Sequence, residues 1–286
     1  GGLTSIRFGA AAVDGLHADL VQREGLPALQ KRSPARLPLE ARLELENIFY
    51  SYPNAEGVGV RGISLDIPAG STTGIVGSTG AGKTTLVDII LGLLTPSSGA
   101  LLADGVAVTP ANIRGWQANL GYVPQDIFLV DASVAENIAL GISPDRIDRA
   151  RVAECARLAQ IDRFIEGELP AGYDADVGER GVRLSGGQRQ RIGIARALYH
   201  DPQVIVFDEA TSALDNLTEQ ELMKAIDALS GIKTIIMIAH RLSTVRTCDR
   251  IAVLDKGSLV ATGKYSDLAA DNEHFRRMSG VSDGLR

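Results

Sequence analysis

The chain has 286 residues, 45% of them hydrophobic, enough to bury the core of one large α/β domain or two small ones. Its 29 basic and 35 acidic residues give a formal net charge of −6, which argues against a dedicated nucleic-acid-binding protein. Cys155 and Cys248 lack metal-ligand spacing, so we expect reduced thiols in a cytosolic compartment. No apolar run reaches the ~20 residues that span a bilayer.

The first 42 residues divide into two expected segments. Apolar residues recur at steps of three or four over residues 3–21, which predicts an amphipathic helix. Pro27, Pro34 and Pro38 then predict an irregular or extended linker, because proline fixes φ and lacks an N–H.

The next part of the chain begins with strands and continues with helices. Alternating apolar residues from Leu43 to Ile67 predict half-buried strands. A strand over residues 71–76 leads into a glycine-rich loop and a helix over residues 83–94. Residues 126–199 have helical periodicity, which predicts a helical subdomain.

The last third returns to alternating strands and helices. Val204–Phe207 is a continuous apolar run, typical of a strand buried on both faces. A helix over residues 218–229, a strand over 234–238 and a hairpin at Lys256-Gly257 are expected next. We expect a helical tail over residues 271–286.

The loop from Gly77 to Thr84 matches the phosphate-loop pattern G-x-x-x-x-G-K-[ST]. Its glycines let successive N–H groups point at phosphates, and the helix starting near Lys83 adds its positive dipole end. Lys83 would reach the β- and γ-phosphates, and the Thr84 hydroxyl would ligate Mg²⁺. Because a strand and a helix flank the loop, we interpret it as a nucleotide site rather than a fortuitous turn.

A second glycine-containing motif, Leu184-Ser185-Gly186-Gly187-Gln188, precedes another helix. Ser185 alone predicts an N-cap. Two glycines in a first turn cost stability, however, and with an exposed helix N-terminus they would form a second phosphate-binding surface. One P-loop and a second, distant phosphate cradle indicate a composite site.

This motif resembles the signature of ATP-binding-cassette (ABC) proteins, and the resemblance covers about residues 43–270. It implies an α/β fold: a P-loop NTPase core with an antiparallel β subdomain and an inserted α-helical subdomain, about residues 126–199, that carries the signature. It also implies MgATP as ligand and a head-to-tail pair of domains, each ATP lying between one P-loop and the partner's signature.

Two acidic residues and a glutamine resemble the family's catalytic motifs. Val204–Glu209 resembles the Walker B strand, where Asp208 would hold Mg²⁺ and Glu209 would act as general base. Gln125, ending Gly121-Tyr122-Val123-Pro124-Gln125, resembles the Q-loop residue that touches Mg²⁺ or the attacking water. In isolation Gln125 would be taken for a surface glutamine.

Three further residues gain a role through the same resemblance. His240 resembles the switch histidine that contacts the γ-phosphate, and Asp215 resembles the D-loop residue at the dimer contact. Tyr52 matches the aromatic residue that stacks on adenine, and Pro53 favours an extended backbone there. Tyr50 is the alternative, and a core role is open for both tyrosines.

The resemblance thus assigns three groups of residues. The catalytic group is Lys83, Gln125, Glu209 and His240; the nucleotide contacts are Tyr52, Gly77, Ser78, Thr79, Gly80, Ala81, Gly82, Lys83, Thr84, Thr85, Ser185, Gly186, Gly187, Gln188 and Asp215; the Mg²⁺ ligands are Thr84, Gln125 and Asp208. The intact glutamate–histidine pair argues against a regulatory sensor that binds nucleotide without hydrolysis.

Asp176–Gly181 resembles the X-loop of exporters with fused membrane and ATPase domains, although alone it would be a charged surface loop. Residues 23–42 carry five basic and two acidic side chains, a bias expected near a cytoplasmic membrane face. Residues 3–21 would end the last membrane helix. We therefore expect a membrane domain fused upstream, a homodimer, and a position at the cytoplasmic face of the inner (plasma) membrane.

Two alternatives remain within the family. The ATPase subunit of an importer would lack residues 1–42 and the X-loop, and a soluble non-transport ABC ATPase would carry a coiled-coil insertion or two cassettes. The general run of the chain is similar to bacterial lipid-linked oligosaccharide flippases and to multidrug or lipid exporters. No physical argument connects these residues to a transported substrate.

Overall fold

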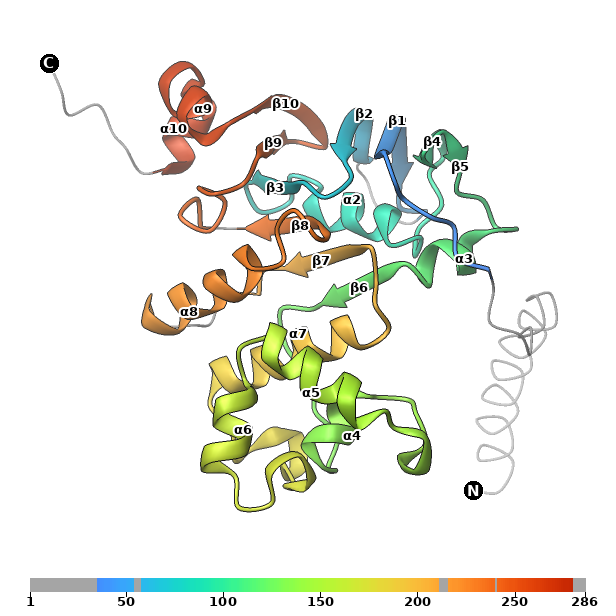
Figure 1. The fold of residues 1–286 in the computed structure, drawn as a ribbon. Coiled ribbons are helices and arrows are strands. Elements are labelled where there is room, and N and C mark those ends of the chain that lie inside the picture. The colour runs from blue at the N-terminus through green and yellow to red at the C-terminus, as the bar shows by residue number, and fades with distance from the viewer. Residues whose placement is uncertain (1–34, 54–57, 211–215, 240, 280–286) are drawn as a thin grey trace, which may run out of the picture. The chain divides into compact units, whose positions relative to one another are not determined.

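The computed structural model describes residues 35–279 except 54–57, 211–215 and 240 (Figure 1). The residues from Arg36 onward form a compact unit. The predicted helix over residues 3–21 lies outside the described residues. In the part of the chain that is described, no helix has the length and apolar character needed to cross a membrane.

A six-stranded sheet forms the centre of this unit, with strand order β10-β9-β3-β8-β7-β6. Strands β9, β3, β8, β7 and β6 are parallel, and β10 pairs antiparallel with β9 through a tight hairpin in which Lys256 and Gly257 have φ of 46° and 81°. Strands β3 and β8 are buried along their whole length. Val204–Phe207 of β7 is also buried, as its continuous apolar run predicts. The bounds are β3 Thr72–Gly77, β6 Leu120–Val123, β7 Val204–Asp208, β8 Thr234–Ala239, β9 Arg250–Asp255 and β10 Ser258–Gly263.

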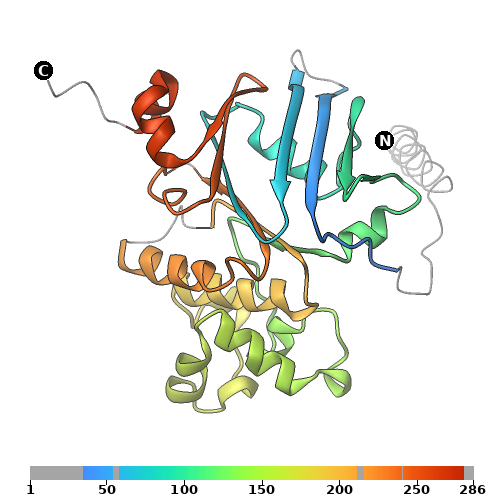
Figure 2. The ribbon, with the colours of Figure 1, turned by 45° about the horizontal axis from the view of Figure 1, so that its top comes forward.

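A second, antiparallel sheet has the order β2-β1-β4-β5. Figure 2 shows β1 and β2 in blue beside the green β4. The bounds are β1 Arg42–Ser51, β2 Val58–Pro68, β4 Ser98–Ala103 and β5 Val106–Ala107. The inner face of this sheet shares one hydrophobic core with helix α2, Lys83–Ile90, and with one face of the six-stranded sheet. Helix α2 therefore covers that face of the central sheet.

Helix α2 ends earlier than the sequence predicts, at Ile90 rather than Leu94. Gly92 has φ of +66°, and a Cβ there would lie 2.3 Å from Cδ1 of Ile113. A left-handed glycine ends the helix at this point and lets helix α3, Ile113–Gln117, approach. The approach is secured by Trp116, which is fully buried and donates its indole N–H to the Ile90 carbonyl at 2.7 Å.

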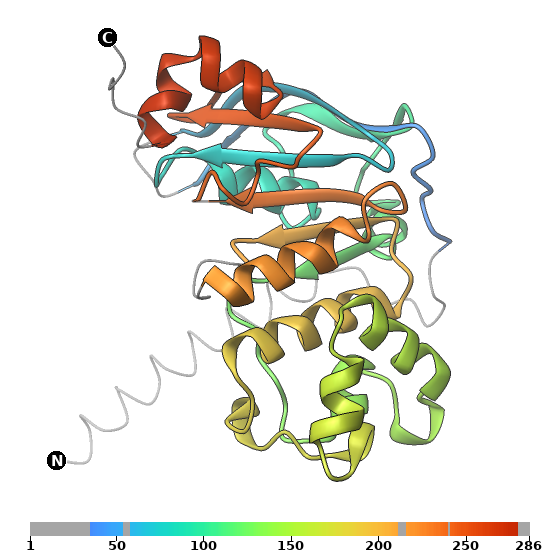
Figure 3. The same cartoon turned by 60° about the vertical axis from the view of Figure 1, so that its left-hand side comes forward.

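The opposite face of the central sheet is covered by α7, Gly186–Tyr199, and α8, Asn216–Asp227. Beyond α7 lie α4 Val134–Ile138, α5 Arg149–Leu158 and α6 Asp162–Glu168 (Figure 3). Residues 126–199 form helices and no strand, as their helical periodicity predicts. Helices α9, Tyr265–Asp271, and α10, Glu273–Ser279, follow β10. The predicted α/β class, with its antiparallel sheet and helical insertion, is confirmed.

A buried asparagine fixes the loop that joins β6 to the helical subdomain. Asn137 is fully buried, accepts a hydrogen bond from the Val130 N–H at 3.0 Å and donates to the Val130 carbonyl at 3.0 Å. Arg196 of α7 donates to the Asn137 carbonyl and to the Phe128 carbonyl, both at 2.8 Å. Because buried polar groups without partners are costly, this network holds the loop in one conformation.

Candidate functional site

The predicted phosphate loop connects β3 to α2, at the edge of the sheet where the parallel strands end. Gly80 and Gly82 have φ of +78° and +97°, the region that favours glycine. A Cβ on Gly80 would meet no atom within 4 Å, whereas one on Gly82 would lie 2.6 Å from the Gly59 carbonyl oxygen. A Cβ on Gly77 would come to 2.4 Å from the Leu254 carbonyl oxygen. Gly77 and Gly82 thus let the loop pack on its neighbours, and Gly80 faces open space.

Lys83 begins helix α2 and is 5% exposed. Its ammonium group donates to the carbonyl oxygens of Gly77 and Ser78 at 2.9 and 3.1 Å. Burial lowers the pKa of Lys83, and the nearby carboxylates of Glu209 and Asp208 oppose that shift. The predicted phosphate-binding lysine and the two predicted Walker B acids therefore lie within electrostatic reach of one another.

The two acids end strand β7 next to the loop. Glu209 has φ of 50°, a left-handed conformation that costs about 1–2 kcal/mol for a residue with a side chain. Its backbone N–H donates to the Ile238 carbonyl at 3.1 Å, which ties this turn to β8. Strain of this kind is concentrated at functional sites. Gln125 follows β6, which is parallel to β7, so Gln125 and the two acids lie after strands that end at the same edge of the sheet.

Two residues outside the predicted set, Tyr122 and Asp88, lie beside Asp208. The Tyr122 hydroxyl of β6 donates to Oδ2 of Asp208 at 2.9 Å. Burial and the Asp208 carboxylate raise the pKa of Tyr122, and the same two causes raise the pKa of Asp88 on α2. Sequence reasoning could have found Tyr122 only by knowing that β6 and β7 are adjacent.

Tyr52 lies beside the first turn of α2. Its hydroxyl is 3.2 Å from the Thr85 hydroxyl, and its side chain is 40% exposed. Tyr50 meets it edge to face, with ring centroids 5.0 Å apart, but packs against the hydrophobic core. Of the two aromatic candidates, Tyr52 therefore offers the more accessible ring next to the phosphate loop.

The signature motif forms the N-terminus of α7. Ser185 is the N-cap: its hydroxyl accepts from the Gln188 N–H at 3.2 Å, and the Gln188 side chain accepts from the Ser185 N–H at 2.7 Å. Gly186 is exposed, but Gly187 is buried, and a Cβ on it would lie 2.2 Å from Cγ2 of Thr218. The second glycine is thus required for close packing of α7 on α8, a contact that the motif alone does not predict.

Helix α7 also reaches the segment that carries Gln125. The Gln190 side chain donates to the Pro124 carbonyl at 3.4 Å. A cavity of about 150 Å³ is lined by Gln125 and its two successors, by the first turns of α7, and by Ala210 directly after Glu209. Residues of the predicted Q-loop, the signature helix and the Walker B turn therefore line the same cavity in the folded structure.

The two predicted phosphate-binding surfaces are nevertheless separate. Helix α2, which follows the P-loop, covers one face of the central sheet, and α7, which follows the signature, covers the other. Figures 1 and 3 show α7 on the far side of β6 and β7 from α2. This arrangement is the one that a composite site between two copies requires.

Other predicted contacts occupy the places that the motif order implies. Ser78, Thr79, Gly80, Ala81 and Gly82 form the loop, and Thr84 and Thr85 lie in the first turn of α2. Asp215 and His240 lie outside the described residues. Among the described residues, no cluster of three or more His, Cys, Asp or Glu could hold a metal ion. The exposed Thr84 hydroxyl and the Asp208 carboxylate are hard oxygen donors, which suits Mg²⁺ held largely by phosphates.

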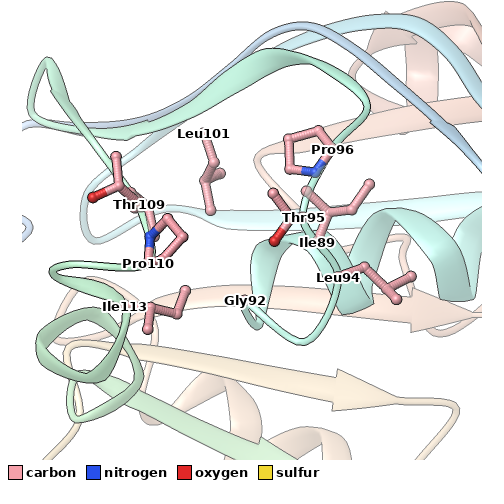
Figure 4. Close-up of a pocket in the computed structure, with 10 residues that line it drawn as sticks. Ile89, Gly92, Leu94, Thr95, Pro96, Leu101, Thr109, Pro110 and Ile113 are labelled. Atoms are coloured by element: carbon pink, nitrogen blue, oxygen red, sulfur yellow. The ribbon is translucent and has the colours of Figure 1, made fainter. Parts of the chain in front are cut away.

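A different pocket lies between the end of α2, strand β4 and helix α3 (Figure 4). It has a volume of about 190 Å³, and apolar side chains such as Ile89, Leu101 and Ile113 line it. The described residues that line it include no charged side chain, so this lining lacks the groups that neutralise phosphates. The P-loop edge, and not this pocket, is the candidate nucleotide site.

Comparisons with known proteins agree with this geometry. The family described as "ABC transporter" matches residues 60–212. The Heterocyst differentiation ATP-binding protein HepA of Nostoc sp. strain PCC 7120 is 41% identical over 87% of this chain and 40% of its own length. The ATP-dependent lipid A-core flippase of Alkalilimnicola ehrlichii is 40% identical over 90% of this chain and 44% of its own length.

A solved structure gives the same result. The structure of a bacterial Atm1-family ABC exporter with ATP bound superposes with a TM-score of 0.81 and 35% sequence identity. The superposition covers 98% of this chain and 49% of that chain. The chain described here thus spans less than half the length of these relatives.

Proposed function

Because the chain belongs to the ABC transporter family and is its nucleotide-binding ATPase domain, we propose that it binds MgATP and hydrolyses it when two copies pair head to tail. One observation carries this proposal. Lys83, Asp208 and Glu209 lie together at the P-loop edge, whereas the signature helix covers the opposite face of the sheet. One copy therefore holds two half-sites that a second copy must complete.

The residues of one copy would bind and orient the nucleotide. Backbone N–H groups from Gly77 to Lys83 surround the phosphates, and the Lys83 ammonium moves from its loop carbonyls to the β- and γ-phosphates. Tyr52 provides a ring for adenine. Thr84, Asp208 and Gln125 would hold Mg²⁺, which would supply charge neutralisation at the phosphates.

The hydrolytic step would use groups at the ends of the neighbouring strands. Glu209 orients the attacking water and accepts its proton, and His240 contacts the γ-phosphate. The partner copy contributes Ser185, Gly186 and the other N–H donors at the start of α7, together with Asp215. Water is excluded only when both copies close, so hydrolysis depends on pairing.

The whole protein is proposed to be an exporter with a membrane domain upstream, located at the cytoplasmic face of the inner membrane. The short span of this chain relative to its relatives supports this, and so does its similarity to a lipid A-core flippase and to an Atm1-family exporter. Residues 1–42 would connect to the membrane domain, residues 43–270 would form the ATPase domain, and residues 271–286 would form a helical tail.

The substitution Glu209→Gln tests the proposal because it removes the base and keeps the shape of the side chain. We expect ATP binding to persist, turnover to disappear, and an ATP-dependent dimer to accumulate in analytical ultracentrifugation. Hydrolysis at the wild-type rate in this variant would contradict the role of Glu209. Failure of the wild-type chain to bind ATP would overturn the proposed function itself.

A further inference from the structure

The hydrogen bond between Tyr122 and Asp208 joins two neighbouring parallel strands at the nucleotide edge. In the register of β6 and β7, Tyr122 pairs with Val206, so Tyr122 and Asp208 project from the same face of the sheet. The donor–acceptor distance is 2.9 Å, and Oδ2 of Asp208 is the acceptor. The tyrosine ring is 41% exposed, and Asp208 is half-buried.

A second carboxylate, that of Asp88, lies near Asp208. Asp88 of α2 is half-buried, and its carboxyl group lies close enough to Asp208 for the two to interact electrostatically. Within the described part of the chain, the Asp88 side chain makes no hydrogen bond. Two carboxylates at short range repel each other. The Tyr122 hydroxyl therefore gives Asp208 a neutral hydrogen-bond donor beside this second carboxylate.

We propose that Tyr122 is a positioning residue for Asp208. By occupying Oδ2, its hydroxyl restricts rotation of the carboxylate and leaves Oδ1 as the oxygen that serves the magnesium ion or its bound water. Partners that orient a metal-binding carboxylate in this way commonly change metal affinity or activity by about 10–100-fold when they are removed. This inference rests on the proposed function, because it assigns Asp208 to MgATP binding.

The test is the substitution Tyr122→Phe in the full chain. We measure Mn²⁺ binding in the presence of ATP by electron paramagnetic resonance, and ATP binding in the presence of EDTA by calorimetry. Because Tyr122 is partly exposed, we expect the lower end of that range, a rise of roughly tenfold in the half-saturating Mn²⁺ concentration. Affinity for metal-free ATP should not change. We expect kcat to fall, whereas KM for ATP, measured at saturating metal, should stay the same.

Two matched variants separate positioning from other causes. Tyr265→Phe removes a hydroxyl from a ring in α9 that keeps its edge-to-face contact with Phe275, and it should leave metal binding unchanged. Asp88→Asn removes the neighbouring charge and leaves the Tyr122 donor in place. We expect a smaller effect on the Mn²⁺ concentration from Asp88→Asn than from Tyr122→Phe.

Several results would overturn the inference. Equal Mn²⁺ affinity in Tyr122→Phe and wild type would show that the hydroxyl does not position Asp208. Loss of metal-free ATP binding, or a fall in Tm together with it, would show a structural role for Tyr122. An effect of Asp88→Asn as large as that of Tyr122→Phe would assign the change to charge alone. If wild type binds no ATP even without metal, the proposed function fails first, and that result is distinct from these.

Discussion

The N-termini of α2 and α7 both face proposed phosphate positions, but they begin in different ways. Helix α2 starts after Gly82, which has φ of 97° and provides no side-chain cap. Helix α7 starts after Ser185 and has a complete capping box with Gln188. The first N–H groups of a helix lack partners within the helix. In α2 no side chain caps these N–H groups, so they are left to bind a ligand. In α7 the capping box provides acceptors for the N–H groups of Ser185 and Gln188.

This difference implies a division of labour between the two half-sites. The P-loop end, with its uncapped helix and buried Lys83, should provide most of the affinity of a single copy for ATP. The signature end is already satisfied by its own side chains, so it should add binding energy only when a second copy closes over the phosphates. A monomer should therefore bind ATP without hydrolysing it efficiently.

The largest expected effect comes from Lys83→Ala, which removes the charged donor of the P-loop half. Hydrogen bonds to charged groups contribute about 1.5–3 kcal/mol, so we expect monomer affinity for ATP to fall by roughly 10–100-fold. A fluorescent ATP analogue measures this directly. Lys224→Ala, at an exposed position of α8, is the control for loss of one positive charge. Similar losses in both variants would contradict the special role of Lys83.

A second prediction concerns the packing of the signature helix on α8. Gly187→Ala should place a methyl group against Cγ2 of Thr218, at 2.2 Å before relaxation. We expect a loss of about 1–3 kcal/mol in the free energy of unfolding, because overpacking forces helices apart. ATP affinity of the monomer should stay the same, and dimer-dependent hydrolysis should fall. Chemical denaturation and steady-state hydrolysis measure the two effects.

The double variant Gly187→Ala with Thr218→Ser sharpens this test, because serine lacks the Cγ2 methyl group that the new Cβ would meet. We expect most of the lost stability to return, giving a coupling energy between the two sites. Additive effects of the two substitutions would show that the contact between α7 and α8 does not explain the glycine at this position.

The sequence predicts the order of strands and helices well, because apolar periodicity is a local property. It misses features that depend on which elements become neighbours. The end of α2 is set by the packing of Ile113 on Gly92. The need for glycine at position 187 is set by the contact with Thr218. Both partners are remote in the sequence.

The site shows the same limit. The motifs locate the P-loop, the signature and the two acids, since each is a continuous segment. Tyr122 escapes notice because its contact with Asp208 exists only once β6 and β7 are paired. Choosing between Tyr52 and Tyr50 as the adenine-stacking residue likewise requires the burial of each ring. The alternation of apolar residues in the sequence does not determine that burial.

The smallest predicted effect is that of Ser185→Ala, which removes the side-chain cap of α7 and leaves its backbone intact. Loss of a serine N-cap costs about 1 kcal/mol, so we expect a decrease of that size in the free energy of unfolding. Ser133→Ala is the matched control, because Ser133 forms the same capping box with Glu136 at the start of α4. Both variants should lose similar stability, but only Ser185→Ala should also slow dimer-dependent hydrolysis. If both slow hydrolysis equally, the effect comes from the stability of the helical subdomain, and the signature serine has no role at the phosphates.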